Sequence, residues 1–92
     1  MGWPVKVYNA IHSGEAKIQI PVFKVHARCY SAVMVPIARS DQLLINCFQD
    51  CKIRHELGET IEAAVEICEN WIRANLWQDV HVIEERKPQT QT

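Results

Sequence analysis

The sequence predicts an α+β domain in which a small antiparallel sheet packs against one long amphipathic helix. Three strand-like segments with short turns between them fill residues 5–37, and residues 60–77 repeat their apolar side chains with the period of a helix. A further short strand is expected over residues 79–85. A chain of 92 residues fits one domain. We therefore expect a single α+β domain over residues 1–85, followed by a disordered polar tail over residues 86–92.

The three predicted strands form a meander. Residues 5–12 alternate Val5 and Val7 with a lysine and a tyrosine. Residues 16–26 put two isoleucines and a valine on one face and polar side chains on the other. Residues 29–37 are rich in the β-branched and aromatic residues that strands favour. Because only short turns separate these segments, we expect neighbouring strands to pair antiparallel.

Pro21 falls inside the second predicted strand. Proline has no backbone N–H to donate to a neighbouring strand, and it is therefore rare in the middle of a sheet. We expect this strand to lie at an edge of the sheet or to bend at Pro21.

The segment over residues 41–57 fits either of two structures. Ser40 or Asp41 would cap the start of a helix, and most of the apolar side chains that follow fall within one arc of a helical wheel. The same residues fit a fourth meander strand in which alternate side chains from Leu43 onward point inward. The cap and the length of the segment favour the helix. Gly58 is expected to supply a left-handed break before the next element.

Residues 60–77 form the clearest element. Thr60 is a suitable N-cap, and Glu62 places a negative charge at the positive end of the helix dipole. Glutamates, an asparagine and an arginine make a compact polar face, while apolar residues cover about 220° of the helix circumference. A helix that packs on one sheet needs an apolar stripe only somewhat wider than about 100°. Something besides the sheet must therefore cover the surplus apolar surface.

This surplus apolar surface best indicates a function. We call it the helix shoulder, and it comprises Ala63, Ile67, Trp71 and Ala74. The chain also contains three tryptophans, a residue enriched at binding hot spots. These observations predict a non-catalytic protein-binding module, such as a small regulator, inhibitor or assembly subunit. The partner would be another protein or a second copy in a homodimer, with Trp71 as the anchor.

A nucleic-acid-binding domain is the alternative function. The formal net charge of the chain is −1, but basic side chains predominate in residues 1–39 and acidic ones in residues 59–92. In the folded domain the basic side chains and the aromatic ones between them would form one face of the sheet. Such a face contacts phosphates and stacks on bases. The residues proposed for it are Lys6, Lys17, Lys24 and Arg28.

The run GETIEAAVEICENWI, residues 58–72, resembles the strand-to-helix segment of HicB-type antitoxins. In that family a Gly-acid-Thr cap opens an alanine-rich helix after a strand meander. The resemblance covers this run alone, since the upstream strands lack the family's proline- and glycine-rich turn and residues 38–57 would be an insertion. It implies a HicB-like antitoxin as one form of the nucleic-acid-binding alternative.

No motif in the sequence indicates catalysis, and no cofactor is expected. The chain lacks the GxSxG and HExxH motifs, and its three glycines make no phosphate-binding loop. The best metal candidates are Cys47, Cys51 and His55, which a helix would align along one face. The two cysteines fall on the apolar arc of that helix, which favours a packed core over a metal site. We therefore expect a protein that is not an enzyme.

The sequence carries neither a membrane span nor a secretion signal. No apolar run approaches the roughly 18 residues that a membrane-spanning helix needs. The first ten residues lack the long apolar stretch of a signal peptide. We expect a cytoplasmic protein without membrane contact, whose four cysteines remain thiols.

Overall fold

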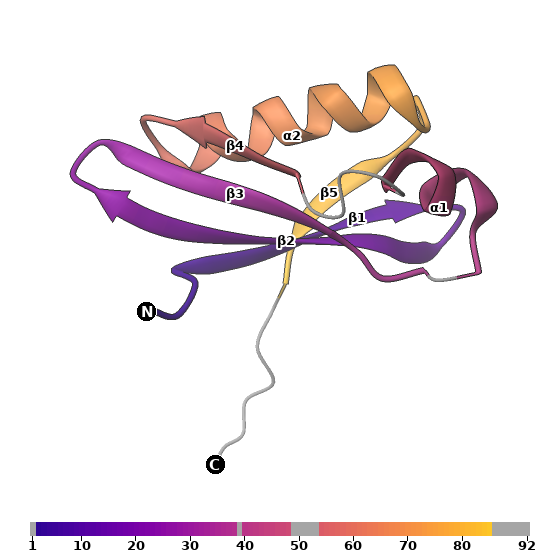
Figure 1. Ribbon diagram of the computed structural model, residues 1–92, viewed down its shortest axis with the longest axis horizontal. Coiled ribbons are helices and arrows are strands. Elements are labelled where there is room, and N and C mark those ends of the chain that lie inside the picture. Colours follow the sequence, from indigo (N-terminus) through magenta and orange to yellow (C-terminus); the bar gives the residue numbers. More distant parts are fainter. Residues whose placement is uncertain (1, 39, 49–53, 86–92) are drawn as a thin grey trace, which may run out of the picture.

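Five antiparallel strands form one sheet in the order β4-β3-β2-β1-β5 (Figure 1). The structure is a computed structural model that describes residues 2–38, 40–48 and 54–85. The elements are β1 (Lys6–His12), β2 (Glu15–His26), β3 (Cys29–Pro36), α1 (Gln42–Phe48), β4 (Arg54–Gly58), α2 (Ile61–Asn75) and β5 (His81–Glu84). The α+β fold class is therefore confirmed. The predicted tail lies outside the described residues.

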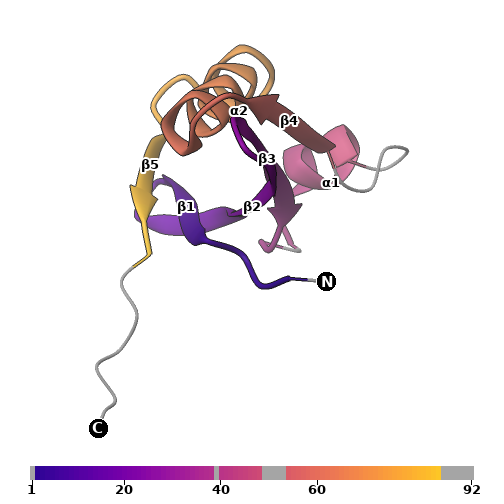
Figure 2. The same ribbon diagram turned by 90° about the vertical axis from the view of Figure 1, so that its left-hand side faces the viewer.

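The sheet curves around α2, which packs against its concave side (Figure 2). Side chains of the central strands and of α2 meet there and exclude water. The fully buried ones are Ala10, Ile18, Ile20, Val22, Ala32, Met34, Ala64, Cys68, Ile72 and Val80. Burying one large aliphatic side chain contributes roughly 1.5–3 kcal/mol, so this layer supplies most of the stability.

A two-residue turn, Ser13 and Gly14, joins β1 to β2 and makes them an antiparallel hairpin. Ser13 and Gly14 both have positive φ, at 55° and 74°. Two successive residues of this kind form the tight hairpin turn whose twist matches that of the strands, and glycine adopts it without steric cost.

Pro21 lies in the central strand of the sheet, contrary to the expectation of an edge. It pairs with Val7 of β1, and on its other side the pairing with β3 is interrupted at Ile20 and Pro21. The pairing resumes at Val22 in the same register. A central strand can thus contain a proline, because the missing N–H interrupts the pairing with only one of its two neighbouring strands, and only over two residues.

The segment over residues 41–57 contains both structures that its sequence allows. The Asp41 carboxylate caps α1, since its Oδ1 accepts a hydrogen bond from Leu44 N at 3.2 Å. After residues outside the described part, β4 adds a fourth meander strand beside β3. Leu44 and Phe48 of α1 are buried and join the core. The favoured helix is therefore confirmed for residues 42–48. The strand alternative was wrong where it was placed, because Leu43 and Ile45 are exposed residues of α1, and the fourth strand forms at 54–58 instead.

Gly58 lacks the left-handed backbone that its sequence position suggested, since its φ is not positive. It ends β4 directly beneath α2, where a Cβ atom would lie 2.5 Å from the backbone nitrogen of Ala64. Glycine is required here because two backbones approach closely.

The long helix begins as predicted. Thr60 is the N-cap, and its Oγ1 accepts a hydrogen bond from Ala63 N at 3.0 Å. The helix ends at Asn75, two residues before the predicted end, and Leu76 N then donates to Ile72 O at 2.7 Å. Ala64, Val65, Cys68 and Ile72 are its buried residues.

Candidate protein-binding surfaces

The convex side of the sheet also carries many apolar side chains, interspersed with the polar residues Asn9, Gln19, Ser31 and His55. Strand residues alternate between the two sides, and directly paired residues share a side. Val7 pairs with Pro21, and Val33 with His55. Pro21 lies between the buried residues Ile20 and Val22, and Val33 lies between the buried residues Ala32 and Met34. We call the resulting surface the convex face; it comprises Val7, Pro21, Phe23, Val33, Val35, Leu57 and Ile83.

Much of the convex face contacts water. Leu57 is 54% exposed and Ile83 is 56% exposed, while the remaining members are half-buried. Both helices pack on the other side, since α2 contacts the concave side and the buried residues of α1 belong to the core. Within the described part of the chain, no helix covers this surface (Figure 2).

A cleft borders the convex face where β1 and β5 meet. Its volume is about 740 Å³, and its lining includes Trp3, Val5, Val7 and Ile83. The Trp3 side chain is 90% exposed. Lys6, Glu84 and Glu85 also line the cleft, so its lining is part apolar and part charged.

Polar groups on the convex side lie close to β5. The Glu85 carboxylate accepts hydrogen bonds from Asn9 Nδ2 at 3.0 Å and from Gln19 Nε2 at 3.4 Å. This carboxylate is consequently already engaged by two amides. The centre of the convex face, from Val7 to Val35, carries no charged side chain.

The helix shoulder is partly covered. Trp71 is half-buried and meets Phe48 of α1 edge to face, with ring centroids 5.7 Å apart and planes at 72°. Ile67 is 40% exposed, Ala74 is exposed and Ala63 is half-buried. Phe48 of α1 thus covers part of the helix shoulder at Trp71. Ile67 remains in contact with water.

The four basic residues proposed for nucleic acid lie apart. Lys6 pairs with Glu84 at 3.6 Å, and Lys17 pairs with Asp41 at 2.9 Å and with Glu15 at 3.2 Å. Lys24 and Arg28 are exposed at the β2–β3 hairpin. Lys17 and Lys24 are about 23 Å apart along β2, at 3.3 Å per residue.

The aromatic residues of that proposal are also divided between the two sides. Tyr8 and Tyr30 lie on the concave side and pack against the core, whereas Phe23 lies on the convex face. The structure therefore does not place the proposed basic and aromatic side chains on one surface.

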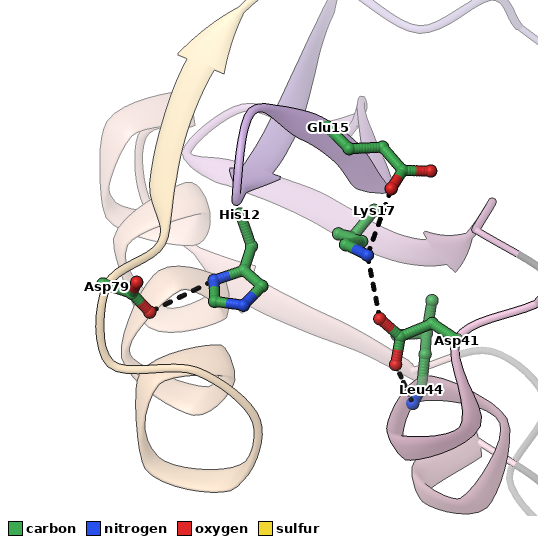
Figure 3. A network of polar contacts seen from close by, with 6 residues as sticks. All are labelled: His12, Glu15, Lys17, Asp41, Leu44 and Asp79. Atoms are coloured by element: carbon green, nitrogen blue, oxygen red, sulfur yellow. Dashed lines mark hydrogen bonds and ion pairs between the residues drawn. The ribbon is translucent and has the colours of Figure 1, made fainter.

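A polar network at the β1–β2 hairpin joins several elements (Figure 3). The His12 ring stacks on Trp77, with centroids 4.7 Å apart, and its Nδ1 lies 3.1 Å from Asp79 Oδ1. Lys17 Nζ lies 5.9 Å from the Trp77 ring centre, between its two carboxylate partners. Although Nδ1 of His12 is buried, it makes no hydrogen bond, so its contact with Asp79 is an ion pair only when the imidazole is protonated.

Within this network, Lys17 and Asp41 stabilise the charged forms of one another. The hydrogen bond to Asp41 raises the pKa of Lys17, and the hydrogen bond from Lys17 lowers the pKa of Asp41. Burial raises the pKa of Tyr8 on the concave side. Since Lys17 and Asp41 bond to one another, the pair ties the start of α1 to β2.

Three cysteines are described: Cys29 and Cys47 are half-buried free thiols, and Cys68 is buried. Cys68 Sγ donates to Ala32 O at 3.6 Å. Cys51, one of the metal candidates, lies outside the described residues. Among the described histidines, cysteines and carboxylates, no group of three is arranged to hold a metal ion.

The comparisons with known proteins return no match. No protein-family model, no curated protein and no solved structure matches the chain. The resemblance of residues 58–72 to HicB-type antitoxins therefore has no support beyond the capped helix itself. No helix in the described ranges is long and apolar enough to cross a membrane.

Sequence reasoning missed the convex face. In β1 the alternation exists, but Tyr8 and Ala10 point to the core and Val7 points away from it. The available signal was in β3, where Val33 and Val35 alternate with buried Ala32 and Met34. A strand that is apolar at every position indicates a sheet covered on both sides.

Proposed function

We propose that this chain is a non-catalytic protein-binding module that acts through its convex face. The observation that carries the proposal is an apolar sheet surface with no described helix on it, opposite the side that α2 covers. Contiguous apolar patches of more than a few hundred Å² are rare on proteins without a partner. A sheet that is apolar on both sides normally lies between two layers, and a partner would supply the second layer.

The partner best suited to this surface is a protein with an uncharged, apolar patch. The centre of the convex face has no charged side chain to attract a charged ligand, and Glu85 at its margin is engaged by Asn9 and Gln19. Nucleic-acid binding depends on basic contacts to phosphates. Association here would instead gain its free energy from apolar burial, with little dependence on salt.

The helix shoulder is the second contact surface in this proposal. Ile67 is exposed and the edge of Trp71 lies beside it, so a partner or a second copy of the chain could bury both. The contact between Phe48 and Trp71 leaves less of this surface accessible than the sequence indicated. We therefore rank the shoulder below the convex face.

The proposed setting is the cytoplasm. Cys29 and Cys47 are free thiols, which a reducing compartment maintains. A regulator, inhibitor or assembly subunit that binds another protein there needs no cofactor of its own.

Affinity purification from the native host tests the proposed function when matched variants are compared. Leu57→Lys and Phe23→Lys each place a charge on the convex face, and Glu66→Lys places the same charge on the exposed polar face of α2. We expect a partner retained by wild type and Glu66→Lys to be depleted about tenfold or more by both convex-face variants. Circular dichroism and urea unfolding confirm that each variant is folded.

Two further arms separate the alternatives. Loss of the partner with Ile67→Lys alone would assign binding to the helix shoulder. Binding of a random oligonucleotide that weakens with salt and with Lys24→Ala and Arg28→Ala would favour the nucleic-acid function. A partner retained equally by Leu57→Lys and Phe23→Lys would contradict the proposal.

A further inference from the structure

The free edge of β5 has a defined set of backbone groups. Glu85 N donates to Val7 O at 2.7 Å, so Glu85 faces β1. Antiparallel pairing alternates, and Asn9 pairs with Ile83 two residues further along. His81 and Ile83 therefore direct their N–H and C=O groups to β1, whereas Val82 and Glu84 direct theirs to the open edge of the sheet.

This edge has two of the features that limit strand pairing, since β5 is only four residues long and carries Glu84, but the charge of Glu84 is paired with Lys6 of the same chain and three other features are absent. His81–Glu84 contains no proline, no lysine and no bulge, and Ile83 is 56% exposed. β5 is the outermost strand of the sheet and pairs with β1 alone (Figure 2). Its edge therefore presents donors and acceptors to an approaching strand.

We propose that β5 pairs antiparallel with β5 of a second copy of this chain, across a two-fold axis that passes beside Ile83. A two-fold axis perpendicular to the sheet keeps the convex faces of both copies on the same side, so convex-face residues must oppose one another. With the axis at Ile83, that residue opposes its own copy. Val82 of each copy then lies opposite Glu84 of the other copy, and the outward backbone groups of these two residues exchange hydrogen bonds.

A cross-strand pair between His81 and Glu85 selects this register, since the bonds from Asn9 and Gln19 both go to Oε1 of Glu85 and Oε2 can accept from His81. His81 comes to lie opposite Glu85 of the other copy, on the same side of the joined sheet. A shift of the axis to Val82 would place His81 opposite Ile83 and lose this pairing. An opposite-charge or hydrogen-bonding pair across strands is favourable, and a like-charge pair is not.

The joined sheet would have ten strands and one continuous convex surface. The pairing thus goes beyond the proposed binding of a partner, because it uses the edge of the sheet and not its face. The contact area of a four-residue edge strand is small. We expect a weak dimer, with a dissociation constant of roughly 10–100 μM.

Glu84→Pro tests the pairing, with Glu84→Ala as its matched control. Both changes remove the exposed carboxylate that pairs with Lys6, but only proline removes the N–H that faces the open edge. The bonds between β1 and β5 are kept in both variants because Glu84 does not face β1. We expect Glu84→Ala to dimerise like wild type in sedimentation equilibrium, and Glu84→Pro to dimerise about tenfold or more weakly.

Disulfide trapping tests the register independently. Cysteines in place of Ile83 would lie opposite one another at a non-hydrogen-bonded position, where Cα atoms are about 4.5 Å apart and a disulfide can form. Cysteines in place of His81 would lie about 13 Å apart along the joined strands. We expect Ile83→Cys to form a covalent dimer on mild oxidation, well above the level of His81→Cys and of wild type with its native thiols.

The inference is overturned if wild type stays monomeric at millimolar concentration. Equal dimerisation of folded Glu84→Pro and Glu84→Ala would also overturn it. So would equal trapping of Ile83→Cys and His81→Cys. None of these results bears on a different protein at the convex face, which the affinity purification tests separately.

Discussion

At Gly58 the backbone of β4 runs so close to α2 that a side chain has no room. A Cβ atom there would lie 2.5 Å from Ala64 N and 2.9 Å from its Cα, both of which are backbone atoms that cannot rotate away. We expect Gly58→Ala to lower the free energy of unfolding by about 3 kcal/mol, at the upper end of overpacking costs. Urea unfolding measures this value. Gly2→Ala is the control, because nothing lies within 4 Å of Gly2, and an equal small effect at both sites would contradict the close approach.

The Lys17–Asp41 pair predicts how stability depends on pH. The hydrogen bond from Lys17 lowers the pKa of Asp41 in the folded protein. Such a carboxylate stabilises the fold fully above its unfolded pKa of about 3.9, and the contribution is lost as the pH falls through the lower folded value. We expect wild type to exceed Asp41→Asn in free energy of unfolding at pH 7, with the difference shrinking below about pH 4. Asparagine retains the helix cap.

Urea unfolding of both proteins between pH 7 and pH 2 checks this expectation. Lys17 has a raised pKa, so its contribution persists at neutral pH and is lost only as the pH rises through the folded value, above about 10.4. A difference between wild type and Asp41→Asn that stays constant down to pH 2 would show that the ion pair does not contribute.

Residue roles that depend on local sequence were predictable, and those that depend on distant contacts were not. Thr60 and Asp41 each accept a hydrogen bond from the backbone nitrogen three residues further along the chain. The sequence identified Thr60 as a cap, and it offered Asp41 as one of two candidates beside Ser40. The stack of His12 on Trp77 joins segments that are far apart in the chain. Nothing in the spacing of the histidines indicates it, because the curvature of the sheet brings these rings together.

At the scale of elements, α1 is a short helix that depends on its neighbours. Helices of this length are unstable alone, so α1 is held by the Asp41 cap and by the burial of Leu44 and Phe48. Its link to α2 is the edge-to-face contact between Phe48 and Trp71. This contact also decides how much of the helix shoulder a partner can reach.

A double-mutant cycle on Phe48 and Trp71 measures that link. We expect the two alanine substitutions to be non-additive by about 1 kcal/mol in the free energy of unfolding, as aromatic pairs are. Trp71→Ala alone should cost about 2–3 kcal/mol, less than a fully buried tryptophan, because Trp71 is half-buried. Additive effects would show that α1 does not pack on α2, and that the helix shoulder is open for binding.

The sequence predicted the type of each element wherever its apolar residues recur with a single spacing. The 3.6-residue period gave α2, and alternation with turn residues gave β1, β2 and β3. The segment over residues 41–57 was ambiguous because it holds both a helix and a strand. The sequence predicted an edge strand or a bend at Pro21. The edge alternative was wrong, because a central strand can contain a proline when its pairing with one neighbour is interrupted for two residues.

At the scale of the whole molecule, the sheet has apolar side chains on both of its sides. Both helices in the described part of the chain pack on the concave side. The helix α2 covers the concave side, and the convex face has Leu57 and Ile83 more than half exposed. The sequence directed attention to α2, because a helical wheel reveals a surplus apolar arc in a single element. The convex face is spread over every strand, and the order of the strands is needed to see it.

Photo-crosslinking in the native host tests most directly whether the convex face binds a protein. A benzophenone side chain is introduced in place of Phe23 on the convex face, Ile67 on the helix shoulder or Glu66 on the polar face of α2. We predict that position 23 gives an adduct with another protein, identified by mass spectrometry, and that position 66 gives none. An adduct at position 67 or 66 with none at position 23 would contradict the assignment of the convex face as the binding surface.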